Sequence, residues 1–168
     1  MVLHRIAIVI VIACSLLSSA ARADPPLHDA AQAGDVATTT RLLKEGLPID
    51  LQDAQGYTAL HYAVDQGHIE VVTVLLEHGA ETSIQATDGT APLHLAAARG
   101  RPKIALLLLE HDAQVSIYDR HGNTPLCLAA AQGRLETIKV FLSKGAPIGG
   151  DDEEGCVPLE SAVLFVRS

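Results

Sequence analysis

The apolar and polar positions of this chain recur with a step of 33 residues. Four glycines stand at this spacing, at Gly56, Gly89, Gly122 and Gly155. A leucine follows each of them by four residues, and a second glycine follows three of them by eleven, at Gly67, Gly100 and Gly133. A unit of this length cannot bury its apolar face alone, so the fixed step predicts an array of stacked units. Such an array offers another macromolecule an extended surface rather than one deep pocket.

Each unit is predicted to contain a turn followed by two helices. The first glycine of a unit follows polar residues, as in the segment 119–122 (Asp-Arg-His-Gly), and glycine adopts the positive φ that such turns need. A short alanine-rich helix comes next, with a capping threonine at Thr58 and Thr124 and a favourable first-turn proline in three units. Ala91 replaces the capping threonine, which we expect to cost its helix about 1 kcal/mol.

The second helix of each unit is predicted from apolar residues at helical spacing after the second glycine. In successive units these residues are Ile69, Val72, Leu75 and Leu76, then Ile104, Leu107, Leu108 and Leu109, then Leu135, Ile138, Phe141 and Leu142. Left-handed caps are predicted to end these helices at Gly79 and Gly145, with Asp112 a poorer occupant of the same place.

These features resemble the ankyrin repeat, in which a turn, two antiparallel helices and a projecting hairpin-like tip form one unit. The resemblance covers about residues 25–166, and the period, the capping motif and both glycine positions agree in at least three units. It implies an all-α ankyrin-repeat solenoid over residues 24–168, with units at about 25–52, 53–85, 86–118 and 119–151 and a partial cap at 152–168. Val166 stands where glycine would end the first helix of the last unit. This apolar last helix therefore either caps the stack or contacts another molecule.

Residues 1–23 have the layout of a cleaved secretory signal peptide. Arg5 precedes an unbroken apolar run, and Ala21-Arg22-Ala23 forms a small-x-small cleavage site. The run is too short for a transmembrane helix. We therefore expect export with cleavage near Ala23, and periplasmic localisation in a bacterium. A competing interpretation is a lipoprotein box ending at Cys14, which would make the protein a lipid-anchored periplasmic scaffold.

Composition and charge limit the classes of partner. The chain has 48% hydrophobic but only 3% aromatic residues, which suits a core of Ala, Leu, Val and Ile. Its formal net charge is −8, and removing residues 1–23 removes Arg5 and Arg22 but no acidic residue, giving −10. So acidic a chain is not expected to bind nucleic acid through its phosphates, nor an anionic membrane surface. It suits a basic partner protein instead.

The cysteines and histidines do not form a recognisable metal or catalytic motif. His61 and His94 occupy equivalent positions on stacked helices about 8–10 Å apart, too far to share one zinc ion. The resemblance implies that they hydrogen-bond the backbone of neighbouring loops, and that His68 is structural too. The other mature histidines are interpreted as surface or turn residues: His28, His78, His111 and His121. For Cys127 and Cys156 we favour two thiols, although export leaves a disulfide open.

We expect no enzymatic activity, no cofactor and no metal. The sequence lacks a Gly-x-Ser-x-Gly elbow, a phosphate-binding glycine loop and a Cys-x-x-Cys pair. Cys127 replaces the histidine of the helix-start motif, but a reactive thiolate would need a nearby base or cation. The acidic run 151–154 lacks the ligand spacing of an EF-hand and is interpreted as a solvated tip.

The resemblance places the binding surface on the hairpin tips and the exposed side of the first helices. Carried onto this sequence, the partner-binding residues are Gln55, Tyr57, Asp65, Gln66, Thr87, Asp88, Thr90, Arg99, Arg120, His121, Asn123, Gln132, Glu153 and Glu154, with Cys156 beside the last two. Tyr57 is the strongest single candidate, because a tyrosine offers an amphipathic anchor. We expect Tyr57→Ala to weaken binding and to leave thermal unfolding nearly unchanged.

The function expected from these observations is non-catalytic protein–protein interaction by an exported monomer. A narrower alternative is an inhibitor or immunity-type protein that neutralises an exported enzyme or toxin. The acidic surface of such an inhibitor would suit a basic target.

Overall fold

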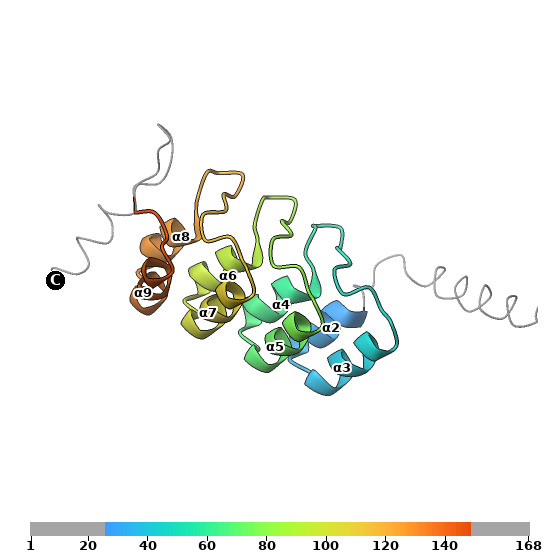
Figure 1. Ribbon diagram of the computed structural model, residues 1–168. Helices are drawn as coiled ribbons and strands as arrows, with labels where there is room; N and C mark the ends of the chain where they lie inside the picture. The colour runs from blue at the N-terminus through green and yellow to red at the C-terminus, as the bar shows by residue number, and fades with distance from the viewer. Residues whose placement is uncertain (1–25, 149–168) are drawn as a thin grey trace, which may run out of the picture.

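The computed structural model describes residues 26–148 and shows four pairs of helices in this range (Figure 1). The first helices of the pairs are α2 (Pro26–Ala33), α4 (Ala59–Gln66), α6 (Pro92–Arg99) and α8 (Pro125–Ala131). The second helices are α3 (Val36–Lys44), α5 (Ile69–Glu77), α7 (Pro102–Glu110) and α9 (Leu135–Ser143). Helices of each kind pack on one another in chain order, so the molecule has two parallel rows. The predicted all-helical stack is thus confirmed.

Three hairpin-like loops project from the same side of the stack, between α3 and α4, α5 and α6, and α7 and α8 (Figure 1). Main-chain hydrogen bonds join neighbouring tips. The N–H of Thr87 donates to the carbonyl of Gln55 at 2.8 Å, and the N–H of Arg120 donates to that of Asp88 at 3.1 Å. The tips therefore form a continuous edge instead of three independent loops.

The core runs between the two helix rows and repeats with the same step as the sequence. Equivalent leucines, Leu60 and Leu93, are 1% exposed, and Phe141 fills the place that Leu75 and Leu108 occupy in the preceding units. Alanines on the first helices are also fully buried, and their small side chains let adjacent helices approach closely.

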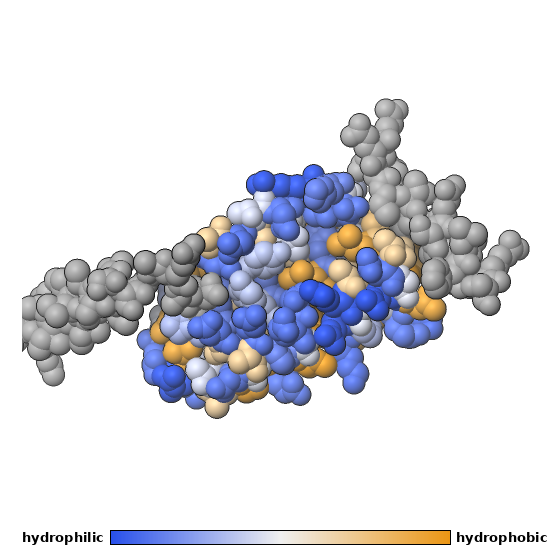
Figure 2. Space-filling view, turned by 180° about the vertical axis from the view of Figure 1, so that it is seen from behind, coloured by the Kyte–Doolittle hydropathy of each residue, from blue (hydrophilic) through white to orange (hydrophobic). Residues whose placement is uncertain are grey.

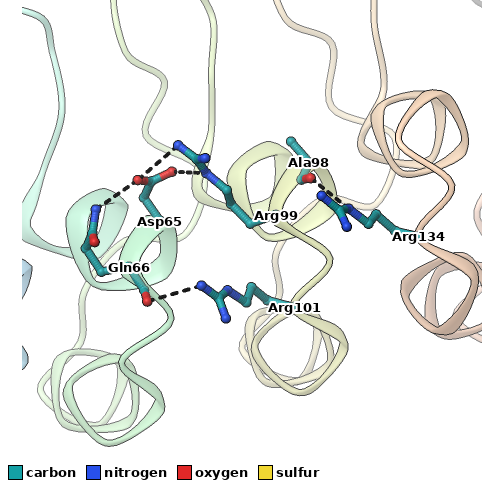
Figure 3. A network of polar contacts seen from close by, with 6 residues as sticks. All are labelled: Asp65, Gln66, Ala98, Arg99, Arg101 and Arg134. Atoms are coloured by element: carbon teal, nitrogen blue, oxygen red, sulfur yellow. Dashed lines mark hydrogen bonds and ion pairs between the residues drawn. The ribbon is translucent and has the colours of Figure 1, made fainter.

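The glycines that end α4 and α6 are required for two reasons. Gly67 and Gly100 have φ values of 85° and 65°, which disfavour a side chain. In addition, a Cβ on Gly67 would lie 2.6 Å from the guanidinium carbon of Arg101. The Nη2 group of Arg101 donates to the carbonyl of Gln66 at 3.3 Å, and Arg134 donates likewise to the preceding unit (Figure 3). Glycine therefore leaves room for the side chain that joins one unit to the next.

His68 occupies the same place as Arg101 in its unit. Its Nε2 lies 3.1 Å from the carbonyl oxygen of Gln32, across the boundary between the first two units. The structural role predicted for His68 is confirmed. Among residues 26–148, Asp112 is the one non-glycine residue with positive φ, at 62°, as its place at a left-handed cap predicts.

The last described unit is less covered than the middle units. Val72 and Ala105 are fully buried, whereas the equivalent Ile138 is partly exposed. Likewise Leu76 is 4% exposed, but the equivalent Leu142 is 42% exposed. In Figure 2, hydrophobic residues are exposed at this end of the molecule, at the right, and also along the lower edge toward the other end. An apolar end face of this kind is what a capping helix would cover.

The predicted cap at 152–168, the signal peptide at 1–23, and the binding residues Glu153 and Glu154 lie outside the described residues. Within the described part, no helix has the length and apolar character needed to cross a membrane.

Candidate functional site

Two buried histidines fix the backbone around the candidate site. In His61, Nδ1 accepts the N–H of Thr58 at 3.1 Å, and Nε2 lies 3.1 Å from the carbonyl oxygen of Thr90 in the next unit. His94 repeats both contacts with Ala91 and Asn123. Burial lowers the pKa of His61 to about 4 and also lowers the pKa of His94. Both rings are therefore neutral near pH 7 and donate from Nε2, and their predicted structural role is confirmed.

The prediction that His28 is a surface or turn residue is wrong. The structure shows His28 only 1% exposed, with Nε2 placed 2.9 Å from the carbonyl oxygen of Tyr57. It stands 33 residues before His61 and makes the same bond between units, so the period itself could have identified it. Its Nδ1 has no partner among the described residues. The residue three positions earlier is Pro25, which has no N–H to donate, unlike Thr58.

A shallow groove of about 420 Å³ lies across the first three units, beside α4 and α6. Five predicted binding residues line it: Gln55, Tyr57, Asp65, Gln66 and Arg99. The remaining lining residues, which the sequence analysis did not select for binding, are Gln32, His61, Tyr62 and Leu95. Gln32 stands 33 residues before Asp65, and Tyr62 lies three residues before Asp65 on the same helix face, so register and helical spacing could have revealed both.

An ion pair between neighbouring units forms one side of the groove. Arg99 on α6 donates from Nε to Oδ1 of Asp65 on α4 at 2.7 Å, and from Nη2 to Oδ2 at 3.3 Å (Figure 3). The amide of Gln66 donates to the same carboxylate at 3.1 Å. The Arg99 side chain is 58% exposed, so the pair contributes less than about 1 kcal/mol to stability. Its main effect is to set the orientation of the two charges.

Two aromatic rings also line the groove. The Tyr57 ring meets His61 edge-on with centroids 5.1 Å apart, and its centroid lies 5.9 Å from that of Tyr62. The Tyr62 hydroxyl donates to Oδ2 of Asp53 at 2.7 Å. Burial raises the pKa of Tyr57, and the carboxylates of Asp88, Asp65 and Asp53 raise it further. The phenol therefore lies in a negative electrostatic environment.

The packing of Tyr57 changes one expectation. Because its half-buried ring contacts His61, we now expect Tyr57→Ala to lower the free energy of unfolding by about 1–2 kcal/mol. Urea unfolding would measure this loss. Binding tests at this position should therefore use Tyr57→Phe, which keeps the ring contact.

The other predicted binding residues lie outside the groove. Thr87, Asp88 and Thr90 are on the second tip, Arg120, His121 and Asn123 are on the third tip, and Gln132 follows α8. Two of these side chains already have partners within their own tip: Oδ1 of Asp88 accepts the N–H of Thr90, and the Asn123 amide donates to Asp119. None of the residues in this set lines the groove.

Cys127 is the one cysteine in the described range, and it is buried. Cys127 is 3% exposed, at the place that histidine occupies in the preceding units. Within residues 26–148, no group of three or more His, Cys, Asp or Glu side chains is arranged to hold a metal ion.

The family comparison agrees with this architecture. The family model described as "Ankyrin repeats (3 copies)" matches residues 9–86 and 81–152. The chain therefore belongs to the ankyrin-repeat family, whose repeats are protein–protein interaction modules and are typically non-enzymatic. The first match begins within the segment that we expect to be a signal peptide. No curated protein matches the chain.

Proposed function

We propose that this chain is a non-catalytic protein-binding monomer, exported to the bacterial periplasm, which holds a basic partner protein in the groove beside α4 and α6. The observation that carries the proposal is the composition of this groove. Residues from three consecutive units line it, and they include charged, amide and aromatic side chains at positions that vary between the units. A surface of this kind is typical of protein recognition, since aromatic residues and arginine contribute most at protein interfaces.

The shape of the groove favours a polypeptide over a small molecule. Small-molecule sites are mostly apolar concavities that enclose the ligand. Here Leu95 is the one aliphatic side chain among the described lining residues, and amides or charges surround it. A segment of a partner protein can span such an open surface and bind at several points along it.

The net charge supports a basic partner. A chain of charge −8, or −10 after removal of residues 1–23, attracts positively charged surfaces and accelerates their association. We therefore expect the association rate to fall as ionic strength rises, while dissociation changes less.

Export is tested by producing the full chain in a bacterial host and measuring the intact mass of the periplasmic product. We expect a mature amino terminus at Asp24. A lipid-modified product beginning at Cys14 would support the anchored alternative, and an uncleaved cytoplasmic product would contradict export.

Binding through the groove is tested with two matched variants. Gln66→Lys adds a positive charge inside the groove, and Gln114→Lys makes the same change at an exposed position outside it. A protein captured by the wild type should be retained by Gln114→Lys and lost by Gln66→Lys. The result must be reproduced with the purified partner by calorimetry. Equal retention by both variants would show that the interface lies elsewhere.

A further inference from the structure

The groove contains a guanidinium group that belongs to the protein itself. Arg99 pairs with Asp65 in a two-point contact, with one nitrogen 2.7 Å and another 3.3 Å from the carboxylate oxygens. This contact links two repeat units, and the arginine side chain remains 58% exposed (Figure 3). The Asp65 carboxylate therefore already binds a guanidinium group, and this ion pair is exposed to solvent, so that another cation can replace Arg99.

Three carboxylates lie near the Tyr57 side chain, and one of them, Asp65, lines the groove. The carboxylates of Asp53, Asp65 and Asp88 all lie close enough to Tyr57 to raise its pKa, after the larger effect of burial. Arg99 and Asp65 are the charged residues that line the groove, and they balance each other. Asp53 and Asp88 lie outside this lining and form no ion pair with a Lys or Arg among residues 26–148. Additional positive charge at this place would be stabilised by all three carboxylates.

The aromatic side of the groove is suited to the same ligand. The rings of Tyr57 and Tyr62 are half-buried and line the same groove as Arg99. Arginine binds both to carboxylates, through its planar fork, and to the faces of aromatic rings. Lysine offers a point charge and lacks the fork, so it fits the Asp65 carboxylate less well.

From this arrangement we propose that the groove binds an arginine side chain of the partner protein, which contacts the rings of Tyr57 and Tyr62 and displaces Arg99 from Asp65. The inference rests on the proposed function, and it adds the chemistry of the anchor residue. It also assigns Arg99 an inhibitory role: the residue occupies the carboxylate until the partner's arginine replaces it.

The proposal is tested with a peptide of six arginines, with six citrullines as a neutral control of the same shape and six lysines as a second cation. The chain has three tyrosines and no tryptophan. In a Tyr118→Phe background the two remaining tyrosines both line the groove, so tyrosine fluorescence reports binding there directly. We expect the arginine peptide to change this fluorescence with the highest affinity, lysine to bind about threefold more weakly, and citrulline to have no effect.

Two substitutions are expected to act in opposite directions. Asp65→Asn should weaken binding of the arginine peptide about three- to fivefold, because it removes the carboxylate acceptor. Arg99→Gln should strengthen binding about two- to fivefold, because Asp65 no longer has an internal partner. The matched control is Glu45→Gln, which breaks the exposed ion pair with Arg41 outside the groove and should leave binding unchanged.

The signal of the Arg99 Nε–H group in a ¹H–¹⁵N spectrum gives an independent readout. It should move toward that of an unpaired arginine as the peptide saturates the groove. Purely structural effects of the substitutions would not produce this peptide-dependent movement.

Three results would overturn the proposal. Equal binding of the citrulline and arginine peptides would exclude charge recognition. Equal weakening by Glu45→Gln and Asp65→Asn would show attraction to net charge alone. Weaker binding by Arg99→Gln would make Arg99 itself the contact residue. If any of these occurs while Gln66→Lys still abolishes capture of the native partner, the groove remains the interface and only the arginine anchor is wrong.

Discussion

Acid should destabilise the protein in a pH range that identifies its buried histidines. The ring of His61 is fully buried, and burial lowers its pKa from 6.5 to about 4. A histidine with a lowered folded-state pKa takes up its proton in the unfolded chain first. Its stabilising effect is therefore complete above about pH 6.5 and declines as the pH falls toward 4.

The size of the effect follows from the difference between the two pKa values. A shift of one unit corresponds to about 1.4 kcal/mol, so His61 alone accounts for a loss of about 3 kcal/mol between pH 6.5 and pH 4. Burial also lowers the pKa of His94, so this residue adds to the loss of stability in acid. The tip carboxylates Asp53, Asp88 and Asp119 have pKa values below 3.8, so their contribution is lost only at lower pH.

The assay is urea unfolding followed by circular dichroism at several pH values between 7.5 and 4.5. For the wild type we expect the free energy of unfolding to fall by at least about 1 kcal/mol per pH unit below pH 6. His61→Gln should be less stable near pH 7, because the N–H of Thr58 loses its acceptor, but its slope should be smaller by about 1 kcal/mol per unit. The same substitution at exposed His111 is the control and should follow the wild-type curve. An unchanged slope in His61→Gln would refute the reasoning.

Four further substitutions test the packing by the same unfolding assay. Thr137 is 1% exposed and its hydroxyl has no hydrogen-bond partner among residues 26–148, so Thr137→Val should raise the free energy of unfolding by about 1–2 kcal/mol; a loss of stability would indicate that the hydroxyl is satisfied. Asp112 has a φ of 62°, and Asp112→Gly should stabilise by about 0.5–1 kcal/mol, whereas no gain would mean that the aspartate is unstrained. Gly67→Ala should cost about 2–3 kcal/mol, but Gly79→Ala only about 1 kcal/mol, because both have positive φ and only Gly67 faces Arg101. Equal costs would exclude the contact with Arg101 as a cause.

The fold could be predicted from the sequence because its stabilising positions repeat. The leucine at Leu60 recurs as Leu93 and Leu126, and each is buried in an equivalent place. The cap at Asp112 could be predicted although its residue type departs from the pattern, since its neighbours set the register. His28 was misjudged because it was considered as an isolated histidine and not compared with His61 in the next unit.

The groove could be predicted only in part, because its lining combines two kinds of position. Gln55 and Asp65 were identified from the family resemblance, and they converge with Arg99. Tyr62 was missed, although helical spacing places it beside Asp65, because Tyr62 and the equivalent Leu95 also pack against the hydrophobic core. The pairing of Asp65 with Arg99 depends on the distance between neighbouring units, which the sequence period does not contain.

The same contacts explain why function cannot be deduced from the period. Neighbouring units share the apolar core, and the side-chain hydrogen bonds between them end mostly on backbone carbonyls. A carbonyl accepts the bond from His61 or Arg101 whatever side chain its own residue carries. The residues that supply those carbonyls, such as Thr90 and Gln66, can therefore vary without separating the units. One consequence is visible at the position of Asp65, which is Ala98 in the next unit. Because alanine offers no acceptor, no equivalent charged pair forms between α6 and α8. We therefore expect recognition to be concentrated beside α4 and α6, while the stack itself remains regular.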